Sequence, residues 1–337
     1  MEYVNRQLLL DKRPTGMPED NCWKMNEEKI SSLQNNEILV KVNYLSIDPY
    51  MRGRMNDSRS YAAPAKIGEP MTGETAGEVI ISNSKLFNVG DLVCAHKGWQ
   101  TFIKVKDTDP AIFKVPETNI NLSAFLGTLG MPGRTAYFGL NRVGKPKHGE
   151  TLVVSAASGA VGAVVGQLGK IYGCKVIGIA GGPEKCSFVK DVLKFDDCLD
   201  YKTGNLEHAL KEVCPNGIDI YFENVGGEVS RAIAPLLNKG SRVPICGFIS
   251  QYNAEDMLKV ETPFHVFGKI KPKPEHRFFV VTEWMNEWEY ATKEILKLVQ
   301  EDKIKFKETI TKGFKNAPQA LRDVLSGKNF GKQIIEI

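Results

Sequence analysis

The segment Thr151–Lys170, which reads TLVVSAASGAVGAVVGQLGK, constrains the fold more than any other part of the chain. Its apolar start, Leu152–Ser155, predicts a buried β-strand that leads through the pattern Ala156-x-x-Gly159-x-x-Gly162 into a helix. Such a unit can hold the diphosphate of a dinucleotide, because the glycines allow close backbone approach and the helix N-terminus presents free N–H groups. Ala156 replaces the first glycine of the usual fingerprint, so a plain strand–turn–helix remains an alternative.

The next strand favours the dinucleotide interpretation and indicates which dinucleotide is bound. Lys175–Ala180 is a second apolar run, so that strand, turn, helix and strand form a βαβ unit. An NAD site usually carries an acidic residue at the end of this second strand, for the ribose hydroxyls. Here the strand is followed by Gly181-Gly-Pro-Glu-Lys185, without that acid and with a lysine, which favours the extra phosphate of NADP. The alternative is that Lys185 is a solvated lysine at the start of a helix.

Composition sets the broad class of the protein. The chain has 337 residues, enough for two domains, with 42% apolar and 25% charged residues, as in ordinary globular proteins. A net charge of +4 is too small to favour nucleic-acid binding. No segment resembles a signal peptide or a bilayer span, and the seven scattered cysteines form no CxxC pair. We therefore expect a cytoplasmic protein with reduced thiols that binds neither membranes nor nucleic acid.

The order of elements predicts two domains of different character. Residues 1–123 are β-rich, with expected strands at 38–45, 75–81 and 91–94. From 124 onward helices and strands alternate, which predicts an α/β fold with a doubly wound parallel sheet. The expected helices are 124–140, 160–172, 184–193 and 229–237, and the expected strands are 152–156, 175–180, 218–222, 241–246 and 278–281. The final segment, 303–337, holds a strand, a helix at 318–325 and a strand at 333–337, and we expect it to return to the first domain.

Six further blocks, taken with this order, carry a resemblance to a known family. They are DPYMRGR (48–54), GMPGRTAY (130–137), ASGAVG (157–162), YFENVGG (221–227), CGFISQY (246–252) and GKNFGK (327–332). Together they resemble the zinc-independent branch of the medium-chain dehydrogenase/reductase superfamily that contains prostaglandin reductases, leukotriene hydroxydehydrogenases and alkenal double-bond reductases. The resemblance covers essentially the whole chain. It implies a GroES-like catalytic domain at 1–123, completed by 304–337, and a Rossmann cofactor-binding domain at 124–303.

The sequence predicts no metal site. Zinc-dependent relatives carry Gly-His-Glu near the segment Met71–Gly77, and the ligand histidine corresponds here to Gly73. A structural zinc lobe would need four closely spaced cysteines, and residues 95–173 contain none. Without a metal, hydrogen-bond donors must polarise a substrate carbonyl, which suits the reduction of a C=C bond conjugated to that carbonyl.

The resemblance implies an enzyme that uses NADP(H) to reduce α,β-unsaturated aldehydes and ketones, including prostaglandin-like 15-oxo substrates, by hydride transfer to the β-carbon. It places the phenol that stabilises the enolate at Tyr252, and Tyr50 is a second candidate donor. Packing roles remain open for both tyrosines and for Arg52. The resemblance also implies these cofactor contacts: Thr135, Gly159, Ala160, Val161, Gly162, Lys185, Tyr201, Asn224, Cys246, Gly247, Phe248, Ile249, Ser250, Gln251, Tyr252, Phe279, Val280, Val281 and Asn329.

One departure from the family pattern concerns the 2′-phosphate. Relatives often carry a serine or threonine before Asp/Glu-Lys, whereas this chain has Gly181-Gly-Pro-Glu-Lys185, so a hydroxyl that could bind the phosphate is missing.

The assembly and two alternative functions complete the expectations. The apolar segment Phe278–Val281 is expected at the edge of the Rossmann sheet, and the resemblance implies that two such edges join in a homodimer. Two other functions remain open: an NADPH quinone reductase, which the DPYMRGR block disfavours, and a non-enzymatic dinucleotide-binding protein.

Overall fold

A computed structural model of the protein describes residues 3–58 and 61–337. Their contacts divide the chain into two compact units. The N-terminal unit comprises the described part of Met1–Gly127 together with Glu308–Asn329 and Gln333–Ile337, and the Rossmann unit comprises Thr128–Lys307 and Phe330–Lys332. In the described part of the chain, no helix is both long enough and apolar enough to cross a membrane.

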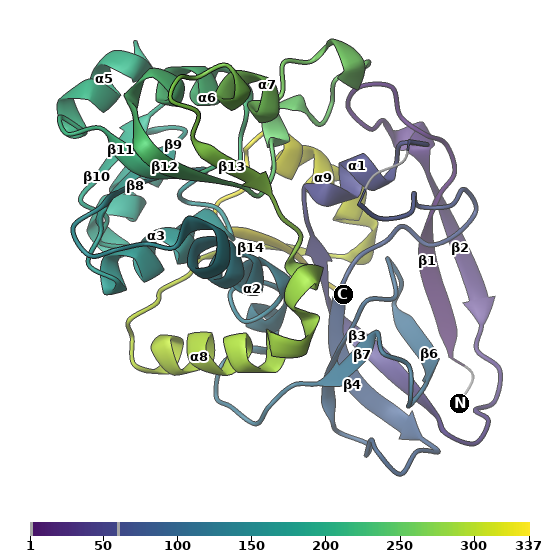
Figure 1. The fold of residues 1–337 in the computed structure, drawn as a ribbon. Helices are drawn as coiled ribbons and strands as arrows, with labels where there is room; N and C mark the ends of the chain where they lie inside the picture. The colour runs from purple at the N-terminus through teal and green to yellow at the C-terminus, as the bar shows by residue number, and fades with distance from the viewer. Residues whose placement is uncertain (1–2, 59–60) are drawn as a thin grey trace. The chain divides into compact units, whose positions relative to one another are not determined.

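The Rossmann unit is built on a parallel sheet of six strands in the order β10-β9-β8-β11-β12-β13 (Figure 1). The strands are β8 (Thr151–Ser155), β9 (Lys175–Ala180), β10 (Asp197–Asp200), β11 (Ile218–Phe222), β12 (Leu237–Ile245) and β13 (Glu275–Phe278). The chain builds outward from β8 to β10, then crosses back to β11 on the other side of β8. The order therefore reverses between β8 and β11, which is where open parallel sheets of this type bind ligands.

Helices cover both faces of this sheet, as expected for strands that are apolar on both sides. They are α2 (Met131–Phe138), α3 (Gly162–Ile171), α4 (Pro183–Ser187), α5 (Leu206–Val213), α6 (Gly227–Ile233), α7 (Pro263–Gly268) and α8 (Trp288–Gln300). Figure 1 shows α5, α6 and α7 on one face, and α2, α3 and α8 on the other. One core cluster packs Val153, Ile177 and Val243 of the sheet against Ile233 of α6 and Phe267 of α7.

The N-terminal unit is mainly antiparallel. Its larger sheet has the order β14-β15-β3-β4-β5-β7, with β6 also paired to β3, and β1 and β2 form a separate hairpin. The elements are β1 (Val4–Leu10), β2 (Trp23–Lys29), β3 (Glu37–Ile47), α1 (Tyr50–Arg54), β4 (Thr75–Ser82), β5 (Leu92–Ala95), β6 (Phe102–Lys106), β7 (Ile112–Lys114), β14 (Glu308–Lys312), α9 (Ala317–Leu325) and β15 (Lys332–Glu336). The two classes of sheet confirm the predicted α/β fold class.

Several expected elements differ from the structure. The expected helix 229–237 is α6 followed by a 3₁₀ turn, Ala234–Leu236, and Leu237 already begins β12, which therefore starts four residues before the expected strand 241–246. Residues 124–140 do not form one helix: a 3₁₀ turn, Leu122–Leu126, ends at Gly127 (φ −126°, ψ −110°), and α2 begins only after Gly130. The expected helix 184–193 is α4 followed by a π-helical turn, Phe188–Val192. The expected strand 278–281 is shifted, because β13 runs in register with β12 from Glu275 opposite Arg242 to Phe278 opposite Ile245, where β12 ends.

Candidate active site

Most of the predicted cofactor residues lie in the loops and first helical turns that follow the carboxyl ends of the six parallel strands. Gly159–Gly162 follows β8, Lys185 follows β9, Tyr201 follows β10 and Asn224 follows β11. The segments 246–252 and 279–281 follow β12 and β13. Because the strands are parallel, all six loops emerge at one edge of the sheet, the edge at which doubly wound folds bind nucleotides.

The turn after β8 carries the pattern Ala156-x-x-Gly159-x-x-Gly162, which the sequence predicts to bind a diphosphate. Ala156 has a left-handed conformation (φ 49°), which is the conformation that the first glycine of the fingerprint normally supplies. At Gly162, where α3 begins, a Cβ atom would lie 2.3 Å from the carbonyl oxygen of Ala156, so only glycine fits. Gly159 forms a parallel bridge with Gly331, so the segment 330–332 of the Rossmann unit supports the turn. The N-terminus of α3 therefore faces a turn whose backbone a ligand can approach closely.

The loops after β9 and β10 bring Tyr201 and Lys185 to the same end of the sheet. The ring of Tyr201 lies against Gly181, where a Cβ atom would be 2.8 Å from the tyrosine Cε1. Asp200 ties the loops together, because its Oδ1 accepts hydrogen bonds from the N–H groups of Gly182 (2.9 Å) and Lys202 (3.0 Å). Burial, and then the neighbouring Lys202 ammonium, lower the pKa of Lys185. Lys202 was not among the predicted site residues.

At the end of β11, a buried carboxylate organises the loop that contains Asn224. Glu223 accepts hydrogen bonds from the hydroxyls of Tyr221 (2.8 Å) and Ser230 and from the N–H groups of Val225 (2.8 Å) and Gly226 (2.9 Å). Burial raises the pKa of Glu223, and these hydrogen bonds oppose that increase. This structural role was not predicted.

Asn224 itself connects β11 to β8. Its side-chain amide donates to the carbonyl oxygen of Ser155 (2.7 Å), and its backbone N–H donates to the Ser155 hydroxyl (2.9 Å). The side chain thus lies between the ends of the two strands where the strand order reverses.

The loop after β12 folds back on itself and on the β11 loop. Ile249 and Ser250 donate backbone hydrogen bonds to Asn224 and Val225. The hydroxyl of Tyr252 lies over Gly247, because a Cβ atom at that glycine would be only 2.5 Å from the phenolic oxygen. The phenol is therefore held at the carboxyl end of β12.

Several other predicted contacts are constrained by their surroundings. The Thr135 hydroxyl donates to the carbonyl oxygen of Met131 (2.8 Å) within α2. Phe279 is buried, and its ring packs against Phe222 and Trp284. Burial, followed by Glu223, raises the pKa of the Cys246 thiol to about 12. Asn329 belongs to the N-terminal unit.

In the N-terminal unit, Tyr50 and Arg52 lie on α1 and differ in their surroundings. The hydroxyl of Tyr50 is buried and has no hydrogen-bond partner among the described residues. Burial, and then the carboxylates of Asp48 and Glu74, raise the pKa of this phenol well above its usual value, so it stays protonated. The buried Arg52 guanidinium donates to the carbonyl oxygen of Gly16 (2.9 Å) and to Asn56 (2.6 Å). Arg52 thus holds a loop in place.

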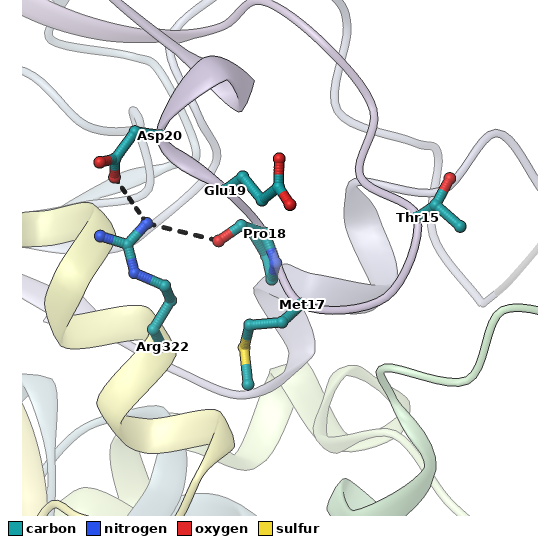
Figure 2. A pocket seen from close by; sticks show the side chains of 6 residues that line it. All are labelled: Thr15, Met17, Pro18, Glu19, Asp20 and Arg322. Atoms are coloured by element: carbon teal, nitrogen blue, oxygen red, sulfur yellow. Dashed lines mark hydrogen bonds and ion pairs between the residues drawn. The ribbon is translucent and has the colours of Figure 1, made fainter.

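A pocket in the N-terminal unit contains none of the predicted site residues. Figure 2 shows the side chains that line it, Thr15, Met17, Pro18, Glu19, Asp20 and Arg322. Arg322 is already engaged there, since it pairs with Asp20 (2.8 Å) and donates to the carbonyl oxygen of Pro18 (3.3 Å).

Comparison with known proteins identifies the family. A family model described as the N-terminal domain of oxidoreductase matches residues 6–114, and one described as zinc-binding dehydrogenase matches residues 160–287. The chain is 43% identical to the NADPH-dependent curcumin reductase of Escherichia coli, over 99% of this chain and 97% of that protein. It is 37% identical to a 2-alkenal reductase (NADP(+)-dependent) of Nicotiana tabacum, over 100% of this chain and 98% of that one. It is 40% identical to prostaglandin reductase 1 of Bos taurus, over 97% of each chain.

Among solved structures, CurA from Vibrio vulnificus in complex with NADPH has a TM-score of 0.92 and 43% identity, covering 98% of both chains. A β-rich unit combined with a Rossmann unit of this kind defines a medium-chain dehydrogenase/reductase. Within that superfamily, the chain belongs to the zinc-independent family that includes the curcumin, 2-alkenal and prostaglandin reductases. This confirms the resemblance found in the sequence.

The residues present do not fit the zinc ion that one of the matched family descriptions mentions. A Cβ atom at Gly73 would lie 3.0 Å from the Met51 Cε and 3.0 Å from the Trp99 ring, so these side chains occupy the space that a ligand at this position would need. In the described parts of the chain, no group of three or more His, Cys, Asp or Glu side chains is arranged to hold a metal.

Proposed function

We propose that this chain is an NADPH-dependent reductase of C=C bonds conjugated to an aldehyde or ketone carbonyl. The observation that carries the proposal is the set of loops at one edge of the Rossmann sheet, with a cation after β9 and a phenol after β12. NADP(H) is the cofactor, as the names of the curcumin and 2-alkenal reductases and the NADPH-bound CurA structure support. The alkenal and prostaglandin reductases support an enal or enone, including prostaglandin-like 15-oxo compounds, as the substrate class.

Each part of the edge has a distinct task in this reaction. The turn Ala156–Gly162 and the α3 N-terminus bind the diphosphate through backbone N–H groups. Lys185 and Tyr201 bind the 2′-phosphate of the adenosine ribose. Asn224 contacts the ribose on the nicotinamide side, from its place between β8 and β11. When bound, NADPH supplies the hydride that adds to the substrate β-carbon.

The phenol of Tyr252 donates a hydrogen bond to the substrate carbonyl oxygen. Negative charge develops on that oxygen as the β-carbon accepts the hydride, so the hydrogen bond is stronger in the transition state than in the bound substrate. Tyr50 is the second candidate donor, because its buried hydroxyl stays protonated and has no partner within the described residues.

The test is to follow the hydride. The protein is given NADPH labelled with deuterium at the transferred position, together with an enal, an enone, a quinone or a simple ketone, and the products are analysed by NMR and mass spectrometry. We expect a saturated carbonyl product with deuterium on the β-carbon and a proton taken up from solvent on the α-carbon. Deuterium on the carbonyl carbon would show alcohol formation, and preferential turnover of the quinone would show a quinone reductase. Cofactor binding without turnover of any compound would indicate a non-enzymatic protein.

A further inference from the structure

The loop after β10 contributes a second lysine to the surroundings of Lys185. Lys202 follows Tyr201, and its backbone N–H is fixed by the carboxylate of Asp200, which also fixes Gly182 in the loop after β9. The side chain of Lys202 lies along Gly181, because a Cβ atom there would be 3.1 Å from the lysine Cε. The Tyr201 ring contacts the same glycine. One residue, Gly181, therefore has both a phenol ring and a lysine chain against it.

The two ammonium groups are close enough to affect each other. The Lys202 charge is the second cause, after burial, of the lowered pKa of Lys185, and Glu184 only partly opposes it. Among the residues that the structure describes, Lys202 forms no ion pair with a carboxylate, whereas the nearby Lys190 pairs with Asp197 (2.8 Å). Two like charges held near each other repel, and a bound anion between them would remove that cost.

The loop after β9 offers the anion few other partners. Gly181 and Gly182 have no side-chain hydroxyl, and Pro183 has no N–H to donate. Recognition of a phosphate at this point therefore depends on charged side chains. A phosphate monoester carries up to two negative charges, which matches two lysines better than one.

We infer that Lys202 is a second cationic ligand of the NADP 2′-phosphate and that, together with Lys185, it sets the preference for phosphorylated over unphosphorylated dinucleotides. This inference rests on the proposed cofactor site at Lys185 and Tyr201. It also accounts for how this chain recognises the phosphate without the hydroxyl that relatives often carry in the loop after β9.

The experiment isolates the phosphate from the rest of the cofactor. Calorimetry measures the Kd of adenosine 2′,5′-bisphosphate and of adenosine 5′-monophosphate for the wild type, Lys202→Ala, Lys185→Ala and Lys190→Ala. We expect Lys202→Ala to raise the Kd of the bisphosphate about 3- to 10-fold, which is the effect of losing an exposed but charge-assisted contact. The Kd of the monophosphate should stay unchanged. Lys190→Ala removes the same charge from the neighbouring helical turn and should change neither Kd.

The outcomes separate this inference from the proposal on which it rests. If Lys185→Ala selectively lowers the affinity for the bisphosphate and Lys202→Ala does not, then Lys202 is a solvated lysine and the inference is wrong. The proposed cofactor site would still stand. If neither variant changes the preference for the bisphosphate, the proposed cofactor site is wrong as well. If Lys190→Ala lowered the affinity for the bisphosphate as much as Lys202→Ala, the effect would come from net charge alone, and the inference would also be wrong. Retention of the preference in Lys202→Arg would support a role for the charge.

Discussion

At the scale of single residues, the placement of the Tyr252 phenol depends on a glycine in its own loop. The hydroxyl lies where a Gly247 side chain would otherwise be, and the ring packs edge-on against Phe248, with 5.6 Å between the centroids. The phenol is therefore fixed by local packing after β12. The proposed catalytic role of the phenol can be tested separately from its packing role, because removing the hydroxyl leaves the ring in place.

Tyr252→Phe should reduce kcat for an enone about 10- to 1000-fold, the usual effect of losing one donor to a developing oxyanion. The Kd of NADPH should stay the same, because the ring and the loop remain. The measurement combines steady-state kinetics with a fluorescence titration of NADPH. An unchanged kcat would transfer the donor role to Tyr50 or to a ribose hydroxyl of the cofactor, and would leave Tyr252 as a packing residue.

Gly247→Ala should have a similar effect on kcat without removing any hydroxyl. The new Cβ atom would lie 2.5 Å from the phenolic oxygen, so the Tyr252 side chain has to move. The matched control is Gly268→Ala, since a Cβ atom at that glycine has no atom within 4 Å. Kinetics on both variants, together with their thermal unfolding midpoints, test this prediction. Full activity in Gly247→Ala would mean that the observed position of the phenol is not required for catalysis.

The sequence indicated some of these residues and not others, for physical reasons. Lys185 follows a strong apolar strand, so its place at the sheet edge could be inferred from the pattern. Lys202 follows β10, whose four residues include two aspartates and give no strand signal. Without that strand, the residue pattern did not bring Lys202 near Lys185, and the resemblance implied a contact only for its neighbour Tyr201. The Gly247 contact with Tyr252 depends on how the loop folds, and the residue pattern does not specify that.

At the scale of elements, the turn between β8 and α3 keeps an alanine in a conformation that favours glycine. A left-handed conformation costs an L-residue about 1–2 kcal/mol, while glycine adds about 0.5–1 kcal/mol of unfolded-state entropy. Ala156→Gly should therefore stabilise the protein by about 0.5–1 kcal/mol, seen as a higher urea midpoint.

The neighbouring Ala157→Gly is the control for this turn. Ala157 is fully buried and has no positive φ, so its replacement by glycine removes packing and should lower the urea midpoint. If Ala156→Gly lowered stability as much as Ala157→Gly, the left-handed backbone at Ala156 would carry no cost. The affinity for NADPH, measured on both variants, shows whether the diphosphate turn keeps its shape.

The elements themselves show where pattern-based prediction works and where it fails. Long apolar strands such as β9 and β11 were predicted within a residue, because both of their faces are buried. Helix α5 was missed, although Asn205 caps it and Glu207 pairs with Lys211 one turn later, a signal that the sequence does contain. The prediction of one helix over 124–140 was wrong because the glycines at 127 and 130 interrupt it.

At the scale of the whole molecule, activity should not depend on a metal ion. Met51 and Trp99 fill the space beside Gly73, and no alternative cluster of ligands exists in the described residues. Prolonged dialysis against a chelator should leave kcat unchanged, and elemental analysis should find zinc far below one atom per chain. Zinc at one atom per chain, lost together with activity and restored with it, would contradict the prediction.

The second whole-molecule prediction concerns assembly through the edge of the Rossmann sheet. Within residues 3–58 and 61–337, strand β13 is the last strand on one side of the sheet and pairs only with β12, while β10 is the last strand on the other side. An uncovered strand edge offers backbone groups to another chain. Two β13 strands related by a twofold axis would join two sheets into one by an isologous contact.

We therefore expect sedimentation at micromolar concentration to give about twice the chain mass of 37.4 kDa. The two edges of the same sheet supply an internal control for hydrogen exchange. Backbone amides of Glu275–Phe278 should become more protected as protein concentration rises through the dissociation range, whereas those of Asp197–Asp200 should not change. Equal behaviour of the two edges would place the interface elsewhere. A monomer that keeps full activity at every concentration would show that the catalytic edge of the sheet is complete within one chain.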